Sequence, residues 1–197
     1  MNNIEKRDKG LGYIVDDEIL EQLAQARSLT QKLNALDRAN FRGIEEIITQ
    51  LFGSSNKPFV NPPFYCDYGF NIHVGKNFYC NFNCTFLDVA PITIGDNVWI
   101  GSNVSLYTAG HPIHPETRNT QIEYGRPITI GDNVWIGGNV VINPGVSIES
   151  NTVIGSGSVV TKDIPDWVVA AGNPCRVIRK ITEDDRDILY KNESVKV

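Results

Sequence analysis

Residues 127–137 read PITIGDNVWIG, and residues 91–101 read the same eleven letters. An identical internal copy of this length points to a repeat architecture. The finer period is six residues, and the branched aliphatic residues that recur at this step are Ile130, Ile136, Ile142, Ile148, Ile154 and Val160. A second row stands two residues earlier and comprises Ile128, Val134, Val140, Val146, Thr152 and Ser158. Residues two apart on a strand face the same way. The pattern therefore predicts short strands with one inward row, separated by turns at glycines and Asp-Asn pairs, as in a parallel β-helix.

The six-residue register breaks twice. Two residues are inserted near 89–91, where a row that ends at Ile92 gives way to one that begins at Ile94. The second break is the segment 107–127, which is rich in polar residues and has few that suit an inward row. We expect this segment to leave the coil as a loop, and long ordered loops of this kind usually carry function.

The sequences on either side of the repeats have a different character. Residues 1–56 are expected to be helical, with one amphipathic helix over Asp17–Leu36, a second over about Arg38–Phe52, and Gly53 placed to stop it. The β-helix is expected over 57–181. Residues 182–197 mix charges with few apolar side chains, which is typical of a short helix or a frayed tail.

Composition excludes several classes of protein. The 197-residue chain carries a net charge of -5, which argues against binding nucleic acid through bulk positive charge. It contains no apolar run of the roughly 20 residues that a membrane span needs and no signal peptide, so we expect a soluble cytoplasmic protein. Its four cysteines form no C-x-x-C pair and are expected to be reduced thiols in the core.

One histidine in the loop is the strongest candidate for chemistry. The sequence contains no nucleophile elbow, phosphate-binding loop or dinucleotide fingerprint. Histidine is the residue type best suited to acid–base chemistry at neutral pH, and His111, within TAGHP at 108–112, could remove a proton from a hydroxyl group. A histidine that is merely hydrogen-bonded within the loop is the structural alternative at this point.

The order of several motifs identifies a family resemblance. They are NFN at 81–83, LD at 87–88, GHP at 110–112, NPGV at 143–146, VTKDIP at 160–165 and AGNPCRVI at 171–178. Over about residues 17–181 the chain resembles the maltose/galactoside O-acetyltransferases, which are hexapeptide-repeat acyltransferases. The resemblance implies a left-handed β-helix, since parallel crossovers are ordinarily right-handed. It also implies direct transfer of an acetyl group from acetyl-CoA to a sugar hydroxyl, without an acyl-enzyme, by a homotrimer with its sites between the prisms.

The resemblance assigns roles position by position. His111 matches the general base and Asn81 the residue that holds the thioester carbonyl, while Glu123 could orient the imidazole. Positions matching the acceptor site are Asp67, Tyr79, Asp88 and one of Asp16 and Asp17, between which the sequence does not choose. Positions matching the acetyl-CoA site are Asn81, Trp135, Gly138, Ser156, Thr161, Lys162, Arg176 and Arg179. Relatives can have serine where this chain has Gly138, so only a backbone contact is expected there. Trp135 could flank the donor or form a subunit contact.

Two other functions are weighed against the transferase. In γ-class carbonic anhydrases, which share this type of fold, three histidines from adjoining subunits bind zinc. Here His73, His111 and His114 lack the spacing of that family, and we expect no metal site. A non-catalytic scaffold is the other alternative, although a purely structural prism has no need of a polar extruded loop.

Overall fold

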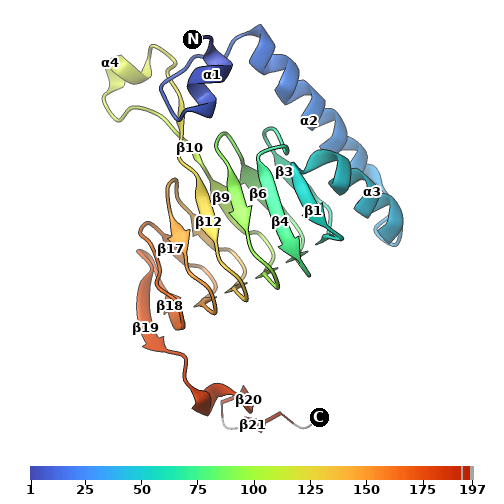
Figure 1. Ribbon diagram of the computed structural model, residues 1–197, viewed down its shortest axis with the longest axis vertical. Helices are drawn as coiled ribbons and strands as arrows, with labels where there is room; N and C mark the ends of the chain where they lie inside the picture. The colour runs from blue at the N-terminus through green and yellow to red at the C-terminus, as the bar shows by residue number, and fades with distance from the viewer. Residues whose placement is uncertain (192, 196–197) are drawn as a thin grey trace.

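The computed structural model describes residues 1–191 and 193–195. It is a mainly β, three-sided, left-handed parallel β-helix whose coils stack along one axis (Figure 1). Each side is a sheet, and we number the sides as faces 1 to 3 in the order in which the chain meets them within a coil. The chain therefore turns at three edges, called edge 1/2, edge 2/3 and edge 3/1.

The strands of each face are parallel, with an antiparallel final strand on face 2. Face 1 contains β1 (Ser54–Asn56), β4 (Ile72–Lys76), β7 (Ile92–Ile94), β12 (Ile128–Ile130) and β15 (Ser147–Ile148). Face 2 contains β2 (Phe59–Val60), β5 (Tyr79–Cys80), β8 (Trp99–Ile100), β13 (Trp135–Ile136), β16 (Val153–Ile154), β18 (Val168–Ala171) and β19 (Arg176–Lys180). Face 3 contains β3 (Phe64–Cys66), β6 (Cys84–Leu87), β9 (Ser105–Tyr107), β14 (Val141–Ile142) and β17 (Val159–Val160).

The hexad pattern is confirmed as the inward row. Ile136 pairs with Ile100 on one side and Ile154 on the other, and all three side chains are buried. The insertion near 89–91 is confirmed by the pairing of β4 with β7, which aligns Val74 with Ile94. These rows form one continuous hydrophobic core along the prism axis. All four cysteines are buried and unbridged, as expected.

The glycines of the turns have a different role from the one expected. Positive φ angles at edge 1/2 and edge 2/3 fall mostly on asparagines, such as Asn97 and Asn103, and not on the preceding glycines. Gly95 and Gly101 are required instead by close stacking, because a Cβ atom at Gly101 would lie 2.6 Å from the backbone nitrogen of Gly138 in the next coil. Asparagine tolerates the left-handed conformation and also bonds along the edge: Nδ2 of Asn97 donates to Oδ1 of Asn133 at 3.0 Å.

Helices cover one end of the prism. α1 (Asn3–Asp8) precedes α2 (Asp17–Ala35) and α3 (Phe41–Leu51), and the last two pack beside β3 and β2, respectively. The amphipathic helix expected over Asp17–Leu36 is confirmed as α2. The expectation of helix up to residue 56 is wrong at its end, because residues 54–56 form β1. Gly53 does not end α3 through a positive φ; a Cβ atom there would lie 2.0 Å from the carbonyl oxygen of Phe70.

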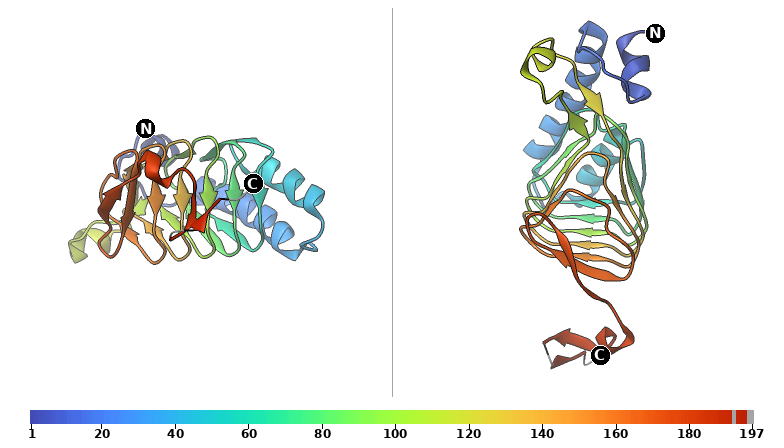
Figure 2. Two further views of the ribbon diagram at one scale, coloured as in Figure 1. Left: turned by 90° about the horizontal axis from the view of Figure 1, so that it is seen from below. Right: turned by 90° about the vertical axis from the view of Figure 1, so that its left-hand side faces the viewer.

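Two segments leave the prism. The predicted loop is present and is called the arm (residues 107–127); it contains β10 (Ala109–Gly110), α4 (Pro115–Arg118) and β11 (Tyr124–Gly125). It projects from the same edge of the prism over which α1 lies (Figures 1 and 2). In the described part of the C-terminal segment, the 3-10 turn η1 (Glu183–Asp185) is followed by the hairpin β20 (Ile188–Tyr190) and β21 (Glu193–Ser194), which differs from the expected short helix or frayed tail. This hairpin lies beyond the prism (Figure 2). Over the described residues, no helix is long and apolar enough to cross a membrane.

Candidate active site

The exposed imidazole of His111 follows β10 directly. Its Nδ1 lies 3.1 Å from the backbone carbonyl oxygen of Ile122, shortly before β11 in the returning half of the arm. A carbonyl oxygen only accepts hydrogen bonds, so a neutral imidazole in this contact carries its proton on Nδ1. Nε2 then has a lone pair available, which is the arrangement that a general base needs.

The expected contact between Glu123 and the imidazole is corrected by this geometry. The partner of Nδ1 in the described structure is the Ile122 carbonyl, one residue before Glu123. The backbone of Glu123 forms a two-way bridge with Tyr13, with N–H···O distances of 2.9 Å in both directions. Its carboxylate raises the pKa values of Asp67 and Tyr13, in each case behind the larger effect of burial. Glu123 therefore belongs to the acidic surroundings of edge 3/1 and does not hold the imidazole.

Asp88 does not contact solvent. Its exposed fraction is 0%, and its Oδ1 accepts the backbone N–H groups of Asp67 at 3.0 Å and Tyr68 at 2.9 Å. Burial raises the pKa of Asp88, against the effect of these hydrogen bonds. The expectation that Asp88 contacts an acceptor is therefore wrong for this structure: its carboxylate fixes the backbone turn that presents Asp67. Burial, then Asp88, then Glu123 raise the pKa of Asp67 to about 6.

The two N-terminal aspartates are placed differently. Asp16 is the N-cap of α2, where Oδ1 accepts the N–H of Ile19 at 3.2 Å and Oδ2 accepts the Asn3 amide at 2.8 Å. Hydrogen bonding from Asn3, then from Ile19, lowers the pKa of Asp16. Asp17 lies in the first turn with its side chain exposed. Asp17 is thus the one of the two whose carboxylate is not already engaged as a cap.

A second group of expected residues stacks along edge 2/3. Asn81, Gly138 and Ser156 occupy this edge in different coils, each after a strand of face 2. The backbone also links coils here, because the N–H of Gly157 donates to the Gly138 carbonyl at 2.9 Å. Asn81 accepts the N–H of Phe82 on Oδ1 at 2.8 Å, which leaves its Nδ2 end to donate.

Face 2 presents aromatic side chains beside this edge. Tyr79, Trp99 and Trp135 are register partners on successive strands, and the two tryptophans are 61% and 57% exposed. The ring of Tyr79 stacks on Phe59 at a centroid distance of 5.7 Å, and its hydroxyl accepts the Asn61 amide at 3.2 Å. This exposed aromatic column is of the kind found at ligand or subunit contacts.

Within one chain, Asn81 and His111 lie on opposite sides of face 3. Asn81 precedes β6, whereas the arm leaves from the far end of β9, the neighbour of β6. A strand of four residues such as β6 separates these edges by about 13 Å. We therefore distinguish two half-sites: the edge half-site, which is edge 2/3 with Asn81 and the neighbouring Tyr79 of face 2, and the arm half-site, which is His111 with Asp67.

The expected cationic residues lie in the last coils. Lys162 follows Thr161 at edge 3/1, and both side chains are exposed. Arg176 and Arg179 are on β19, at the margin of face 2. Arg179 binds both carboxylate oxygens of Asp185 at 2.8 Å, a hydrogen-bonded pair that raises the pKa of Arg179. A phosphate group at Arg179 would therefore have to replace the Asp185 carboxylate.

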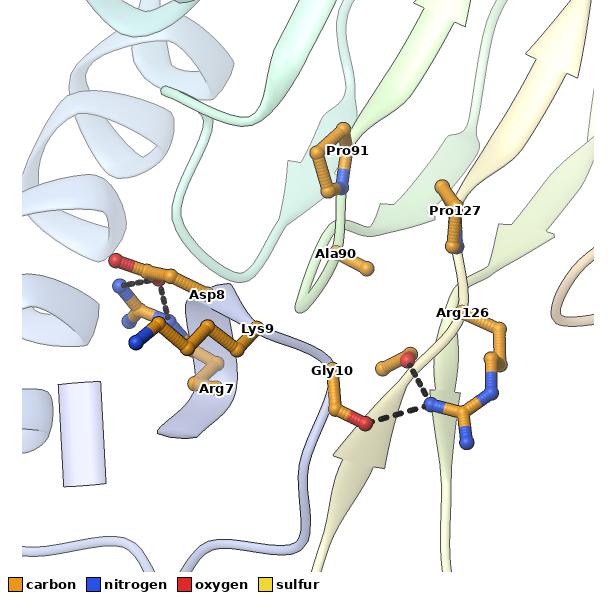
Figure 3. Close-up of a pocket in the computed structure, with 9 residues that line it drawn as sticks. Arg7, Asp8, Lys9, Gly10, Ala90, Pro91, Arg126 and Pro127 are labelled. Atoms are coloured by element: carbon orange, nitrogen blue, oxygen red, sulfur yellow. Dashed lines mark hydrogen bonds and ion pairs between the residues drawn. The ribbon is translucent and has the colours of Figure 1, made fainter. Parts of the chain in front are cut away.

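A hollow of about 490 Å³ lies beside the base of the arm (Figure 3). It separates residues 7–10 from the edge 3/1 residues Ala90, Pro91 and Pro127. Arg126 lies along its wall and donates from Nη1 to the carbonyl oxygens of Gly10 at 2.7 Å and Gly125 at 2.8 Å.

Three features of this region have no signal in the sequence. The Ile122 group that holds His111 is a backbone carbonyl, and side-chain patterns carry no information about it. Tyr13 is buried against Tyr68 and Val89, but it belongs neither to a helix nor to the hexad repeats, so no periodic pattern marks it as a core residue. The bridge from Tyr13 to Glu123 joins residues that are far apart in the chain. In residues 1–191 and 193–195, no cluster of three His, Cys, Asp or Glu side chains is arranged to hold a metal ion.

Comparison with known proteins shows close relatives. Residues 127–162 match the family model "Bacterial transferase hexapeptide (six repeats)", and residues 83–110 match "Hexapeptide repeat of succinyl-transferase". The chain is 49% identical to the galactoside O-acetyltransferase of Escherichia coli, over 89% of this chain and 87% of the relative. A maltose O-acetyltransferase structure from Clostridium difficile is 52% identical, with a TM-score of 0.90 over 93% of this chain and 99% of that chain. A galactoside acetyltransferase in complex with coenzyme A is 45% identical, with a TM-score of 0.96 over all of both chains.

Proposed function

This chain belongs to the maltose and galactoside O-acetyltransferases of the hexapeptide-repeat family, and on that premise we propose that it transfers the acetyl group of acetyl-CoA to a hydroxyl group of a sugar. The observation that carries the chemistry is the contact between His111 Nδ1 and the Ile122 carbonyl, because it leaves Nε2 as a base on an exposed arm.

The reaction is a direct transfer between the two substrates. Nε2 of His111 removes the proton of the sugar hydroxyl while the hydroxyl oxygen bonds to the thioester carbon. The carbonyl oxygen becomes an oxyanion, and the Nδ2 amide of Asn81 donates a hydrogen bond to it. Collapse of this intermediate breaks the carbon–sulfur bond, and the coenzyme A thiolate takes the proton back from the imidazolium. The products are an acetylated sugar and coenzyme A.

The two half-sites meet between chains in this proposal. Since one chain holds Asn81 and His111 at different edges, the protein acts as a homotrimer in which the arm of one chain reaches edge 2/3 of its neighbour. The flat faces and the exposed column of Trp99 and Trp135 support such packing.

Each substrate then has its own set of residues. Acetyl-CoA lies along edge 2/3 of one chain, beside Trp135, the Gly138 backbone and Ser156. Its phosphates bind Arg176 and Arg179, together with Thr161 and Lys162 at edge 3/1 of the neighbouring chain that supplies the arm. Lysine acts on a phosphate as a point charge and arginine as a fork of donors. The acceptor hydroxyl groups bind Asp67 and Asp17 of one chain and Tyr79 of the other, since carboxylates accept hydrogen bonds from sugar hydroxyls.

The test is a panel of sugars and amino sugars with acetyl-CoA, followed by the release of free thiol. We expect His111→Ala to lower kcat by about 10²–10⁴-fold, the usual contribution of a general base. His114→Ala is the matched control, because it removes an exposed histidine from the same arm, and it keeps wild-type activity. Equal activity of both variants and the wild type would refute the assignment of the base.

Coenzyme A binding is tested separately. Lys162→Ala weakens binding in a titration calorimeter, whereas Lys32→Ala, which removes an exposed lysine from α2, does not. Asp185→Asn releases Arg179 from its ion pair and is expected to strengthen binding. Unchanged affinity in both Lys162→Ala and Arg179→Ala would contradict the assignment of these residues to the donor.

A further inference from the structure

The segment of residues 122–125, which ends in β11, lies between two antiparallel neighbours at the base of the arm. On one edge it pairs with β10, where Gly110 aligns with Tyr124. On its other edge the segment of residues 10–13, which we call the strap, pairs antiparallel through Tyr13 and Glu123. The Ile122 carbonyl that binds His111 belongs to the same middle segment. The position of the imidazole therefore depends on how firmly this segment is held.

Arg126 joins the strap to the arm. Its Nη1 donates to the carbonyl oxygens of Gly10 in the strap and Gly125 in β11. Its backbone N–H donates to the Thr108 carbonyl at 2.8 Å, at the point where the chain leaves β9. One residue thus connects the strap, β11 and the start of β10.

The same guanidinium group contacts the ring that lies against the backbone of Gly110. Cζ of Arg126 lies 5.0 Å from the centroid of the Tyr124 ring, which is within the range of a cation–π contact. The Tyr124 ring lies so close to Gly110 that a Cβ atom there would be 2.7 Å from Cζ of the ring. Gly110 directly precedes His111, so the stacked pair of Arg126 and Tyr124 restricts the backbone that carries the imidazole.

Core packing does not replace these contacts. The hollow of about 490 Å³ lies between residues 7–10 and the prism, so Gly10, the first residue of the strap, borders open space on that side (Figure 3). The buried contacts of the strap begin at Tyr13, which packs in the cluster with Ile19, Tyr68 and Val89. Between the hollow and Tyr13, the strap meets the arm at two points. Gly12 lies against the Ile122 side chain, where a Cβ atom would be 3.0 Å from Cγ2, and Arg126 donates a hydrogen bond to the Gly10 carbonyl.

We propose that Arg126 is a positioning residue for His111, acting through the strap, β11 and the Tyr124 ring. This inference rests on the proposed function, in which His111 is the base. Arg126 touches neither substrate; it holds the Ile122 carbonyl and Gly110 in the geometry that keeps the proton on Nδ1 and aims Nε2 at the acceptor. Loss of this restraint lets the imidazole rotate and populate the other tautomer.

The experiment compares Arg126→Ala, Arg126→Lys and the control Arg42→Ala in the full chain. Arg42 is an exposed arginine on α3 that pairs with Glu46, remote from the arm. Because small misplacements of a catalytic group cost up to about 10²-fold, we expect Arg126→Ala to lower kcat about ten- to a hundredfold. The KM for acetyl-CoA and the melting temperature stay near the wild-type values. Arg126→Lys keeps a donor for Gly10 and recovers part of kcat, and Arg42→Ala behaves as the wild type.

A second readout separates positioning from a merely structural role. Histidine ¹⁵N spectra of the protein, which has three histidines, report the tautomer of His111. We expect a protonated Nδ1 in the wild type and a mixture of tautomers in Arg126→Ala, together with a shifted acid limb in the pH profile of kcat/KM. Wild-type kcat, tautomer and pH profile in Arg126→Ala would overturn the proposal. The proposed function survives that result if His111→Ala remains inactive, and it fails separately if His111→Ala is active.

Discussion

Substitution of Gly101 by alanine tests the close stacking of the coils. The added Cβ would lie 2.6 Å from the nitrogen and 3.0 Å from Cα of Gly138, and 2.9 Å from the carbonyl carbon of Gly137. Ordinary contact begins at 3.4 Å, so the two coils must separate by about 0.8 Å at this edge. All three atoms belong to the backbone, and rotation of a side chain cannot relieve the overlap.

The cost follows from this overlap and from the unfolded chain. Overpacking of this kind costs about 1–3 kcal/mol. The smaller conformational entropy of unfolded alanine offsets about 0.4–1 kcal/mol of it. A net loss of about 1–2 kcal/mol lowers the melting temperature of a chain of this size by roughly 2–8 °C. The separation also strains the hydrogen bond from the Gly101 N–H to the Ile136 carbonyl, now 2.8 Å long.

The assay is thermal unfolding followed by circular dichroism, with all proteins at one concentration because assembly makes the midpoint concentration-dependent. Gly138→Ala is the matched control, since a Cβ there would lie 3.2 Å from the carbonyl oxygen and 3.9 Å from the backbone nitrogen of Ser102, a far smaller overlap than at Gly101. We expect this control to unfold within about 2 °C of the wild type. If Gly101→Ala and Gly138→Ala melt together at the wild-type temperature, the stacking argument is wrong.

Two further substitutions probe the arm half-site and the core. Burial raises the pKa of Asp67 to about 6, above its unfolded value, so the folded state binds the extra proton and stability falls as the pH rises from about 4 to 6. Asp67→Asn removes this loss of stability, and denaturant midpoints measured across the same pH range test the prediction. If the midpoints of the variant and the wild type change with pH in parallel, the prediction is wrong. Ile136→Ala leaves a cavity in the central inward row and costs about 2–5 kcal/mol, measured by urea unfolding. A loss below that of a surface Ile113→Ala control would place Ile136 outside the core.

The fold could be predicted almost entirely because its determinants are periodic. Ile130, Ile136 and the later members of the row repeat every six residues, and each repeat reports the same inward direction. The separate roles of glycine and asparagine within each turn could not be predicted in this way. Glycine and asparagine both suit positive φ, and only the distance between coils shows that Gly101 is small for reasons of contact while Asn103 takes the left-handed conformation.

The site was predictable at His111 and less so around it. The residue stands in a segment that breaks the register, and the structure places it on the expected arm. Its partner is the backbone carbonyl of Ile122, which every residue type possesses and no sequence pattern reveals. Sequence reasoning therefore selects the neighbouring carboxylate, Glu123, for this role. Asp88 illustrates the opposite error, because a carboxylate next to a turn looks available in sequence, whereas its oxygen is turned inward to two backbone N–H groups. Burial of a polar group depends on tertiary contacts that spacing does not report.

Whether one site draws on two chains is tested most directly by mixing two inactive variants. His111→Ala and Asn81→Ala are co-refolded in equal amounts, so that trimers of mixed composition form. A site is intact where a His111→Ala chain provides Asn81 and the neighbouring Asn81→Ala chain provides His111. With random mixing in a cyclic trimer, about a quarter of the sites have this composition, so about a quarter of wild-type activity returns. Activity that stays at the level of the two parent variants would contradict the shared site and place both residues in one chain's own active centre.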